Sequence, residues 1–352
     1  MKSISVVKVG SLRDPDESKR GKVAVRDVPV PEVGDEDVKI KVAYCAICGS
    51  DPHLVENIFG WEIPFGLGHE VSGVVVELGK KATMKGLKVG DRVAGNFLHF
   101  CGRCYYCLNG QQQFCEGIPE GNSGMSEYVV WHESQVYKLP DDVSLKEGCL
   151  LEPTAIAVRI ADKLSMKVGQ RVAINGGGPI GLLTLQVLKM NGATSLTVFE
   201  PVAERREMAL EYGADYAIDP IANDVVEESK KITDGRGFDV VVDASGAVKA
   251  VKSLLDITAK GGQLLYAAMY PNDFEMPLNL NKYLYLNEIT VTGFFVAPYA
   301  FPRSLQLLPK MKLDKFTNKV FTIDQPEEAF AAQISGKYPK ILIQCNEDIA
   351  NL

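Results

Sequence analysis

The chain has 352 residues, of which 46% are hydrophobic and 24% are charged, and its net charge is −7. This composition predicts a soluble globular protein of about two domains, and the acidic balance argues against a nucleic-acid partner. The N-terminal residues show no hydrophobic segment of signal-peptide length, and no run of about 18 apolar residues predicts a membrane span. We therefore expect a cytoplasmic protein that binds neither nucleic acid nor membrane.

The first part of the chain, to about residue 155, is predicted to be rich in β-structure. Residues 38–42 alternate apolar and polar side chains, as a half-buried strand does, and residues 71–78 and 92–94 predict further strands. Glycine and proline residues separate these segments at short intervals, which is typical of turns between strands.

A different pattern begins near residue 171, where short apolar strands alternate with helical segments. Strands are predicted at 171–175, 196–199 and 238–243, and helices at 182–190 and 203–212. Strands that alternate with helices form a parallel sheet built from βαβ units. The sequence therefore predicts an α/β chain with a β-rich part and a doubly wound parallel sheet.

A glycine-rich turn directly follows the first of these strands. It has the sequence Gly-Gly-Gly-Pro-Ile-Gly, which fits the G-x-G-x-x-G pattern of dinucleotide-binding turns. The first glycine permits a tight turn, the third lets the backbone approach a pyrophosphate, and the last lets the next helix pack on the sheet. The start of that helix offers unpaired N–H groups to phosphates. The predicted cofactor-binding residues of the turn are Gly176, Gly178, Pro179, Ile180 and Gly181.

An acidic residue, Glu200, stands at the end of the second strand, 19 residues after Gly181. A carboxylate at this place bonds the adenosine ribose hydroxyls and repels a 2′-phosphate, so NAD is favoured over NADP as the cofactor. Arg205 and Arg206 follow closely and could bind a 2′-phosphate instead, and Arg205 is included among the predicted cofactor-binding residues. The alternative interpretation is a glycine turn without a ligand and a surface glutamate.

Four cysteines occur within 15 residues at the spacing C-x2-C-x2-C-x7-C. Four thiolates so close together suit a closed tetrahedral zinc site, which leaves no position open for substrate and is therefore structural. In a reducing compartment, clustered cysteines are expected to be metal ligands and not disulfides. An iron–sulfur cluster, which uses similar spacings, is the alternative. The predicted ligands are Cys101, Cys104, Cys107 and Cys115.

A second set of metal-ligating residue types is dispersed along the chain, at Cys48, His69, Glu70 and Glu152. A catalytic zinc needs few protein ligands and an open position, so one thiolate, one imidazole and one carboxylate would serve. Each residue alone has an ordinary explanation, such as a core histidine or a Glu-Pro turn. Their occurrence beside a dinucleotide-binding pattern favours a second, catalytic zinc.

Together these motifs resemble those of the zinc-containing medium-chain alcohol dehydrogenases, over nearly the whole chain. Residues 68–82 are similar to the family's zinc signature, G-H-E-x2-G-x5-G-x2-A, and residues 47–51 are similar to its first-ligand loop. The four cysteines and the glycine turn follow in the family's order. The resemblance implies a GroES-like catalytic domain of residues 1–156 and 298–352, with an NAD-binding Rossmann domain of residues 157–297 inserted between them.

The resemblance also implies roles for the dispersed ligand set. Cys48 and His69 would bind the catalytic zinc, and Glu70 would be a ligand or a close neighbour that exchanges with water or substrate. The third protein ligand would be Glu152, as in the sorbitol and threonine dehydrogenase branch, where simple alcohol dehydrogenases have a cysteine. Cys149 lies near in sequence, but the Glu-Pro pair that follows Leu151 favours Glu152.

Further residues gain a role only from the resemblance. Ser50 matches the family's relay hydroxyl and His53 its outer relay residue, so both are predicted to move a proton between substrate and solvent. Residues 289–295 are similar to the edge strand through which family members pair their sheets, so a homodimer or homotetramer is expected. Sorbitol dehydrogenases have an Arg-Tyr pair just after that strand, where this chain has Val296-Ala297.

The expected function is hydride transfer between NAD and a small secondary alcohol or ketone, by an enzyme with one catalytic and one structural zinc. The favoured substrates are a polyol, a sugar derivative or a similar vicinally oxygenated compound. A threonine-type hydroxy-amino acid and a simple alcohol are the alternatives. A zinc-free quinone reductase of the same fold and an inactive NAD-binding relic are further alternatives, and both zinc-ligand sets argue against them.

Overall fold

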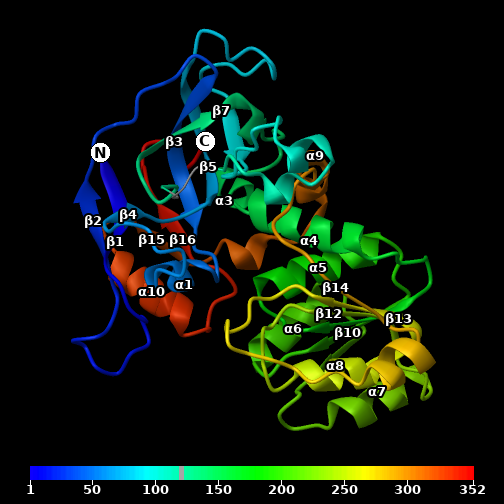
Figure 1. The fold of residues 1–352 in the computed structure, drawn as a ribbon. Coiled ribbons are helices and arrows are strands. Elements are labelled where there is room, and N and C mark those ends of the chain that lie inside the picture. Colours follow the sequence, from blue (N-terminus) through cyan, green and yellow to red (C-terminus); the bar gives the residue numbers. More distant parts are fainter. Residues whose placement is uncertain (119–122) are drawn as a thin grey trace. The chain divides into compact units, whose positions relative to one another are not determined.

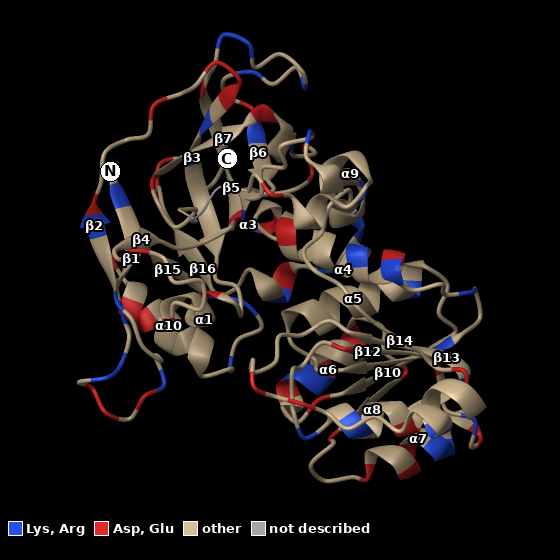
Figure 2. Cartoon of the chain, viewed as in Figure 1, with Lys and Arg blue, Asp and Glu red and all other residues tan. Residues whose placement is uncertain are grey.

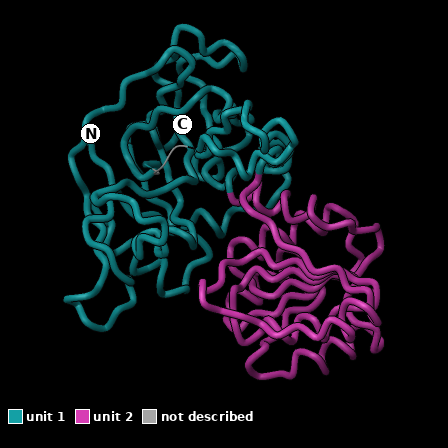
Figure 3. The backbone as a smooth tube through the Cα atoms, viewed as in Figure 1, with its two compact units in different colours: residues 1–152, 298–352 teal, residues 153–297 magenta. Residues whose placement is uncertain are grey.

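The computed structural model describes residues 1–118 and 123–352. The chain divides into two compact units, shown in Figure 3. The first unit consists of residues 1–152 and 298–352, and the second consists of residues 153–297. Within the described residues, no helix has both the length and the apolar character that crossing a bilayer requires. Basic and acidic residues are interspersed along both units (Figure 2), as on an ordinary solvated surface.

The described residues of the first unit form two β-sheets (Figure 1). A three-stranded sheet has the order β2-β1-β4, and a larger sheet has the order β15-β16-β3-β5-β6-β8, with β7 paired to β3. The strands are β1 (Lys2–Lys8), β2 (Lys22–Asp27), β3 (Asp37–Ala46), β4 (Phe65–Gly66), β5 (Glu70–Leu78), β6 (Arg92–Gly95), β7 (Tyr128–His132), β8 (Val136–Lys138), β15 (Val320–Thr322) and β16 (Leu342–Gln344).

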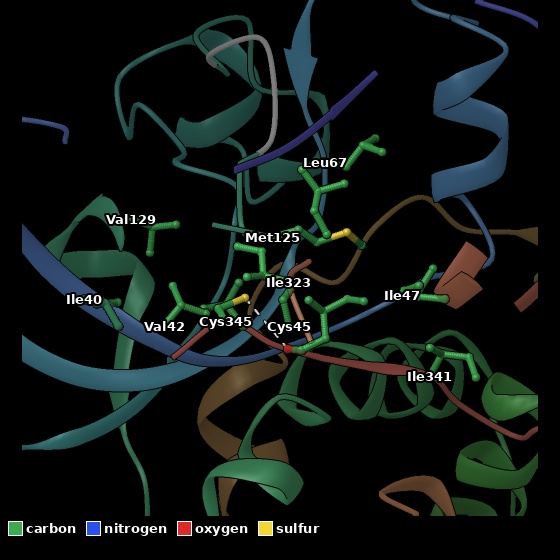
Figure 4. Packing of buried hydrophobic residues seen from close by; sticks show 14 of the residues in the cluster. Ile40, Val42, Cys45, Ile47, Leu67, Met125, Val129, Ile323, Ile341 and Cys345 are labelled. Atoms are coloured by element: carbon green, nitrogen blue, oxygen red, sulfur yellow. Dashed lines mark hydrogen bonds between the residues drawn. The ribbon is translucent and has the colours of Figure 1, made fainter. Parts of the chain in front are cut away.

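The long strand β3 organises the larger sheet. It pairs antiparallel with β5, β7 and β16, and its register with β5 shifts twice, near Lys39 and near Val42. Such irregularities bend a strand and increase its twist, so one strand can pair with different neighbours along its length. Figure 4 shows Ile40, Val42 and Cys45 in the core that this strand forms. β3 thus connects the core to the loop that begins at Ile47.

Short helices complete the first unit. In chain order, those of the described residues are α1 (Asp51–Val55), α2 (Tyr105–Leu108), η1 (Gln112–Phe114), η2 (Glu133–Gln135), α3 (Leu145–Gly148), α9 (Phe301–Leu307), η4 (Leu308–Lys310), η5 (Asp314–Phe316) and α10 (Pro326–Ile334). Proline starts several of them because its fixed φ suits the first helical turn, where an N–H has no intrahelical acceptor. Pro52 in α1 is one example, and it places the start of that helix two residues after Gly49.

The second unit is built on one six-stranded parallel sheet with the order β11-β10-β9-β12-β13-β14. This is the strand order of a doubly wound dinucleotide-binding fold, in which the first strand lies at the centre. Its strands are β9 (Arg171–Asn175), β10 (Ser195–Phe199), β11 (Tyr216–Ile218), β12 (Phe238–Asp243), β13 (Thr258–Tyr266) and β14 (Thr290–Gly293). The helices are α4 (Leu151–Lys163), whose first two residues belong to the first unit, α5 (Pro179–Met190), α6 (Ala203–Glu211), α7 (Val225–Thr233), α8 (Val251–Ile257) and the π-helix η3 (Asn281–Leu286).

The continuous apolar sequences of the central strands explain why both faces of this parallel sheet are buried. Val240, Val241 and Val242 of β12 are fully buried, as are Ala173 and Ile174 of β9. Strands that are covered on both faces carry such continuous apolar runs, because helices shield both sides of a parallel sheet. The predicted α/β fold with a doubly wound parallel sheet is therefore confirmed.

Candidate active site

The pairing of β3 with β5 brings three predicted metal ligands together. Ala46 at the end of β3 lies opposite Glu70 at the start of β5, so Cys48 and His69 lie just beyond the ends of the two paired strands. One ligand atom each of Cys48, His69 and Glu70 lies within 4.8 Å of the others. His69 is 5% exposed and Glu70 is fully buried. Antiparallel pairing thus makes a compact site from residues about 20 positions apart in sequence.

The carboxylate of Asp51 lies beside the imidazole of His69. The backbone N–H of Cys48 donates to Asp51 Oδ2 at 2.7 Å, and Asp51 Oδ1 lies 3.6 Å from His69 Nδ1. Since Nδ1 faces the carboxylate, Nε2 is left for a metal, as in carboxylate–histidine–metal arrangements. Burial lowers the pKa of His69, but Cys48 and Asp51 outweigh it and the net shift is upward. Anionic groups therefore dominate the surroundings of this imidazole, which suits a cation.

Lys340 forms a buried ion pair with Glu70. Its Nζ lies 2.6 Å from Glu70 Oε1, and the two side chains are 2% and 0% exposed. Burial alone would lower the pKa of Lys340, but Glu70 and Cys48 raise it above its usual range, so the lysine stays charged. The other oxygen, Glu70 Oε2, is buried without a hydrogen-bond partner. One oxygen is therefore fixed by Lys340 while the other is available to a metal.

Glu152 lies near this cluster without joining its inner group. It is the second residue of α4, is 7% exposed and interacts electrostatically with His69 and Glu70. Burial raises its pKa to about 7. Cys149, the other candidate nearby, donates its thiol to Lys146 O at 3.0 Å, and burial raises its pKa. The thiol of Cys149 is thus turned to the backbone, which favours Glu152 as the further ligand.

The two predicted relay residues lie on the same loop as Cys48. Ser50 is the residue before α1 and is half-buried, with no hydrogen bond from its side chain to the helix. The side chain of His53 is 50% exposed, and its Nδ1 lies 3.3 Å from Glu56 Oε2. Ser50 therefore lies two residues from the candidate ligand Cys48 in sequence, and the side chain of His53 reaches solvent.

The four predicted structural ligands converge in a loop that contains α2 and η1. Their sulfur atoms all lie within 4.8 Å of one another. Hydrogen bonds from the backbone of Arg103 and Cys104 lower the pKa of Cys101 to about 6, and Cys115 Sγ accepts from Cys101 N at 3.3 Å. Burial raises the pKa of Cys107 to about 12, with the other thiols adding to the shift. Backbone amides that stabilise thiolates and a tight sulfur cluster are what a tetrahedral zinc site requires.

The glycine turn in the second unit lies between β9 and α5. Gly176 has φ +103°, and a Cβ there would lie 3.0 Å from Cα of Ser245. A Cβ on Gly181 would collide with the carbonyl of Gly176, whereas the space beside Gly178 is open. The first turn of α5, from Pro179 through Ile180, has no side-chain cap, so its N–H groups can receive an anion.

Glu200 lies against this turn. It is 3% exposed and accepts hydrogen bonds from Gly177 N at 2.6 Å and Val202 N at 2.9 Å. Arg205 Nη1 lies 4.0 Å from Glu200 Oε2, whereas Arg206 donates to the carbonyl of Glu200 at 2.8 Å. The carboxylate is therefore fixed beside the place where the adenosine ribose of a dinucleotide binds.

Asp51 and Lys340 are further residues of this site that the sequence motifs did not predict. Asp51 stands in the first-ligand loop, and a carboxylate three residues after a ligand cysteine is a usable signal. Lys340 is 270 residues from its partner Glu70. The one sequence feature that points to Lys340 is its position directly before the apolar residues 341–343, which are buried. A lysine in such a place needs a partner for its charge.

Comparisons with known proteins identify the family. Residues 34–141 match the alcohol dehydrogenase GroES-like domain, and residues 179–310 match the zinc-binding dehydrogenase family. A sorbitol dehydrogenase of Halalkalibacterium halodurans is 36% identical over 332 residues, which cover 92% of this chain and 96% of that protein. The chain belongs to the zinc-containing alcohol dehydrogenase family. An L-threonine 3-dehydrogenase of Pyrococcus abyssi is also 36% identical to this dehydrogenase over 332 residues, covering 90% and 93% of the two chains.

Solved structures agree with this assignment. A zinc-binding dehydrogenase from Clostridium scindens has a TM-score of 0.92 and 36% identity to this dehydrogenase, covering 99% and 100% of the two chains. A zinc-binding dehydrogenase from Sinorhizobium meliloti, solved with NADP bound, has a TM-score of 0.85 and 29% identity, covering 97% and 99%. The predicted family and the predicted combination of a GroES-like domain with a Rossmann sheet are therefore confirmed.

Proposed function

We propose that this dehydrogenase uses one catalytic zinc and NAD to interconvert a secondary alcohol and its ketone, with a polyol or sugar derivative as substrate. The observation that carries the proposal is the buried group of Cys48, His69 and Glu70, with Glu152 beside it. A thiolate, an imidazole and one carboxylate would leave a tetrahedral ion with a position for substrate, and the second carboxylate would be the ligand that exchanges with substrate. The four-cysteine loop supplies no such position, so we assign it a structural zinc.

The residues of the catalytic set fit a zinc ion on three observations. The ligand atoms converge, Glu70 Oε2 is buried without a partner, and negatively charged neighbours raise the pKa of His69. Bound zinc would act as a Lewis acid that polarises the oxygen of the alcohol or ketone. The carboxylate of Asp51 lies 3.6 Å from His69 Nδ1 and interacts with the ring electrostatically, and Lys340 fixes the carboxylate of Glu70 before a metal binds.

The proton of the substrate hydroxyl needs a path to solvent. We assign the first step to the hydroxyl of Ser50 and the outer step to the half-exposed imidazole of His53. Histidine suits this position because an imidazole can both accept and release a proton. Glu56, which lies 3.3 Å from His53 Nδ1, stabilises the protonated ring.

NAD is the cofactor that the glycine turn and Glu200 favour. The N–H groups at the start of α5 can hold a pyrophosphate, and the buried carboxylate of Glu200 can accept from ribose hydroxyls. A 2′-phosphate would meet that carboxylate, although Arg205 lies beside it. Initial rates with both cofactors test this assignment, because a higher kcat/KM with NADP would show that Arg205 dominates.

The substrate class follows from the carboxylates at the candidate zinc. Glu70 and Glu152 would supply oxygen ligands in place of a second thiolate, and a zinc held by oxygen ligands would favour a substrate that offers two neighbouring oxygens. The sorbitol dehydrogenase relative supports a polyol. The equally similar threonine dehydrogenase keeps L-threonine as the second candidate. Val296-Ala297 stand where sorbitol dehydrogenases carry Arg-Tyr, so sorbitol itself is not proposed.

We further propose the domain boundaries and the assembly. Residues 1–156 and 298–352 form the GroES-like catalytic domain, and residues 157–297 form the NAD-binding domain. β14 is the terminal strand of the six-stranded sheet, so its outer edge can pair with the same strand of a second copy. A homodimer or homotetramer in the cytoplasm is the expected form, and light scattering of the purified protein measures its mass.

Zinc content combined with activity tests the proposed function. The parent enzyme is expected to hold two zinc ions per chain, and Cys48→Ala is expected to lose one ion and NAD-dependent activity. Cys149→Ala is the matched control, because that buried thiol bonds the backbone, and it is expected to keep both ions. Parent protein without zinc, or Cys48→Ala with full activity, would contradict the proposal.

A further inference from the structure

A buried carboxylate lies at the carboxyl end of the parallel sheet in the second unit. Asp243 is the last residue of β12, and its side chain is fully buried. Asn175, the last residue of β9, lies opposite it in the pairing of the two strands. Because the glycine turn leaves β9 directly after Asn175, the carboxylate of Asp243 lies beside the candidate cofactor turn.

In the part of the chain that the structure describes, the hydrogen-bond donors to this carboxylate are all neutral. Asp243 Oδ1 accepts from Asn175 Nδ2 at 2.8 Å, from Ser245 N at 3.0 Å and from Ser245 Oγ at 2.7 Å. Oδ2 accepts from the phenol of Tyr270. Burial and this carboxylate raise the pKa of Tyr270, so the phenol keeps its proton and donates. Buried charges are usually paired with an opposite charge, and none of these partners supplies one.

The strand order shows which half of a dinucleotide Asp243 faces. Glu200, after β10, marks the half that receives the adenosine ribose, whereas β12 lies on the other side of the central strand β9. Ser245 packs against the turn itself, since a Cβ on Gly176 would lie 3.0 Å from Cβ of Ser245. A dinucleotide whose pyrophosphate lies on this turn therefore extends its nicotinamide half toward β12 and Asp243.

We propose that Asp243 is a fixed negative charge that favours binding of the oxidised nicotinamide cofactor over the reduced one. This inference rests on the proposed use of NAD. The nicotinamide ring is positively charged in NAD and neutral in NADH, and the two molecules are otherwise alike. A nearby carboxylate in a low-dielectric surrounding therefore stabilises the oxidised form selectively. Asn175, Ser245 and Tyr270 are positioning residues that hold the carboxylate in place.

The test compares the dissociation constants of NAD and NADH for zinc-loaded enzyme, by calorimetry at one pH and salt concentration. Asp243→Asn removes the charge and keeps the shape of the side chain. One charge that acts over roughly 10 Å at an effective dielectric constant of about 20 changes the relative affinity on the order of tenfold. The ratio of the NADH to the NAD dissociation constant is therefore expected to fall about tenfold in this variant.

Tyr270→Phe is the matched control, because it removes one donor and keeps the charge. It is expected to change both dissociation constants by a similar factor, so their ratio stays within about twofold. The double variant Asp243→Ser with Tyr270→Phe removes the charge of Asp243 and also the phenol hydroxyl of Tyr270, which would otherwise lose its acceptor. It should reproduce the fall in the ratio of the NADH to the NAD dissociation constant. Circular dichroism verifies that each variant is folded.

The measured affinities for NAD and NADH distinguish a wrong role for Asp243 from a wrong choice of cofactor. If the parent enzyme binds neither NAD nor NADH, the proposed cofactor is wrong. If both bind and the ratio is the same in Asp243→Asn as in the parent, the assignment of Asp243 is wrong. Failure of both charge-free variants to fold would also overturn it, because the carboxylate would then serve the fold and not the selection of a redox state.

Discussion

Lys340→Met tests whether the buried ion pair with Glu70 holds the candidate metal centre together. The two charged groups are 2.6 Å apart and have 2% and 0% of their side-chain surface exposed. Removing one partner of a buried pair leaves the other charge uncompensated, which costs about 3–5 kcal/mol in folding free energy. Bound zinc would offset part of this, so a loss of about 3 kcal/mol is expected in the zinc-loaded enzyme.

Urea unfolding of the zinc-loaded protein, followed by circular dichroism, measures this loss. Lys81→Met is the matched control in the same unit, because Lys81 pairs with Asp35 at 2.8 Å but the side chains are 67% and 56% exposed. An exposed pair contributes at most about 1 kcal/mol. Equal losses of unfolding free energy in the two variants would refute the claim that burial makes the Lys340–Glu70 pair more stabilising than an exposed pair.

Three further predictions concern the other site residues. Cys107→Ser is expected to lose one of two zinc ions and to lower the melting temperature, because metal binding at such sites stabilises the fold; elemental analysis that finds both ions retained would contradict this. Ser50→Ala is expected to lower kcat on the order of 100-fold with zinc content and NAD affinity nearly unchanged. Unchanged kcat in steady-state assays would remove Ser50 from the relay. Zinc affinity at the Cys48 site is expected to fall as pH drops below about 7, because Glu152, with a pKa of about 7, must then release a proton to bind a cation. Zinc titration at several pH values measures this, and Glu152→Gln should make the dependence less steep without abolishing it, because His69 must also lose its proton to bind zinc; an undiminished dependence would exclude Glu152.

Features formed by neighbouring residues could be predicted from the sequence. The glycine turn is one, because its conformational demands and the flanking strand and helix are all local. The four cysteines between Cys101 and Cys115 are another, since their spacing alone brings the sulfurs together. The strands β9, β10 and β12 could be predicted because buried parallel strands are continuous apolar runs.

Long-range polar contacts could not be predicted in this way. Lys340 meets Glu70 only because β16 pairs with β3 and β3 pairs with β5, and no local pattern encodes that register. Asp243 likewise meets Tyr270 only after β12 and β13 align. Single polar residues at the ends of strands carry little periodic signal, so their partners become visible only in the folded chain.

The initial rate of NADH formation on matched alcohols tests the proposed substrate class most directly. Glu70 and Glu152 at the candidate zinc predict that a substrate with two neighbouring oxygens is preferred, so 2,3-butanediol should show a kcat/KM at least about tenfold above that of 2-butanol. L-threonine assayed in parallel tests the second candidate. Equal efficiency with the diol and the simple alcohol would contradict the account of this site.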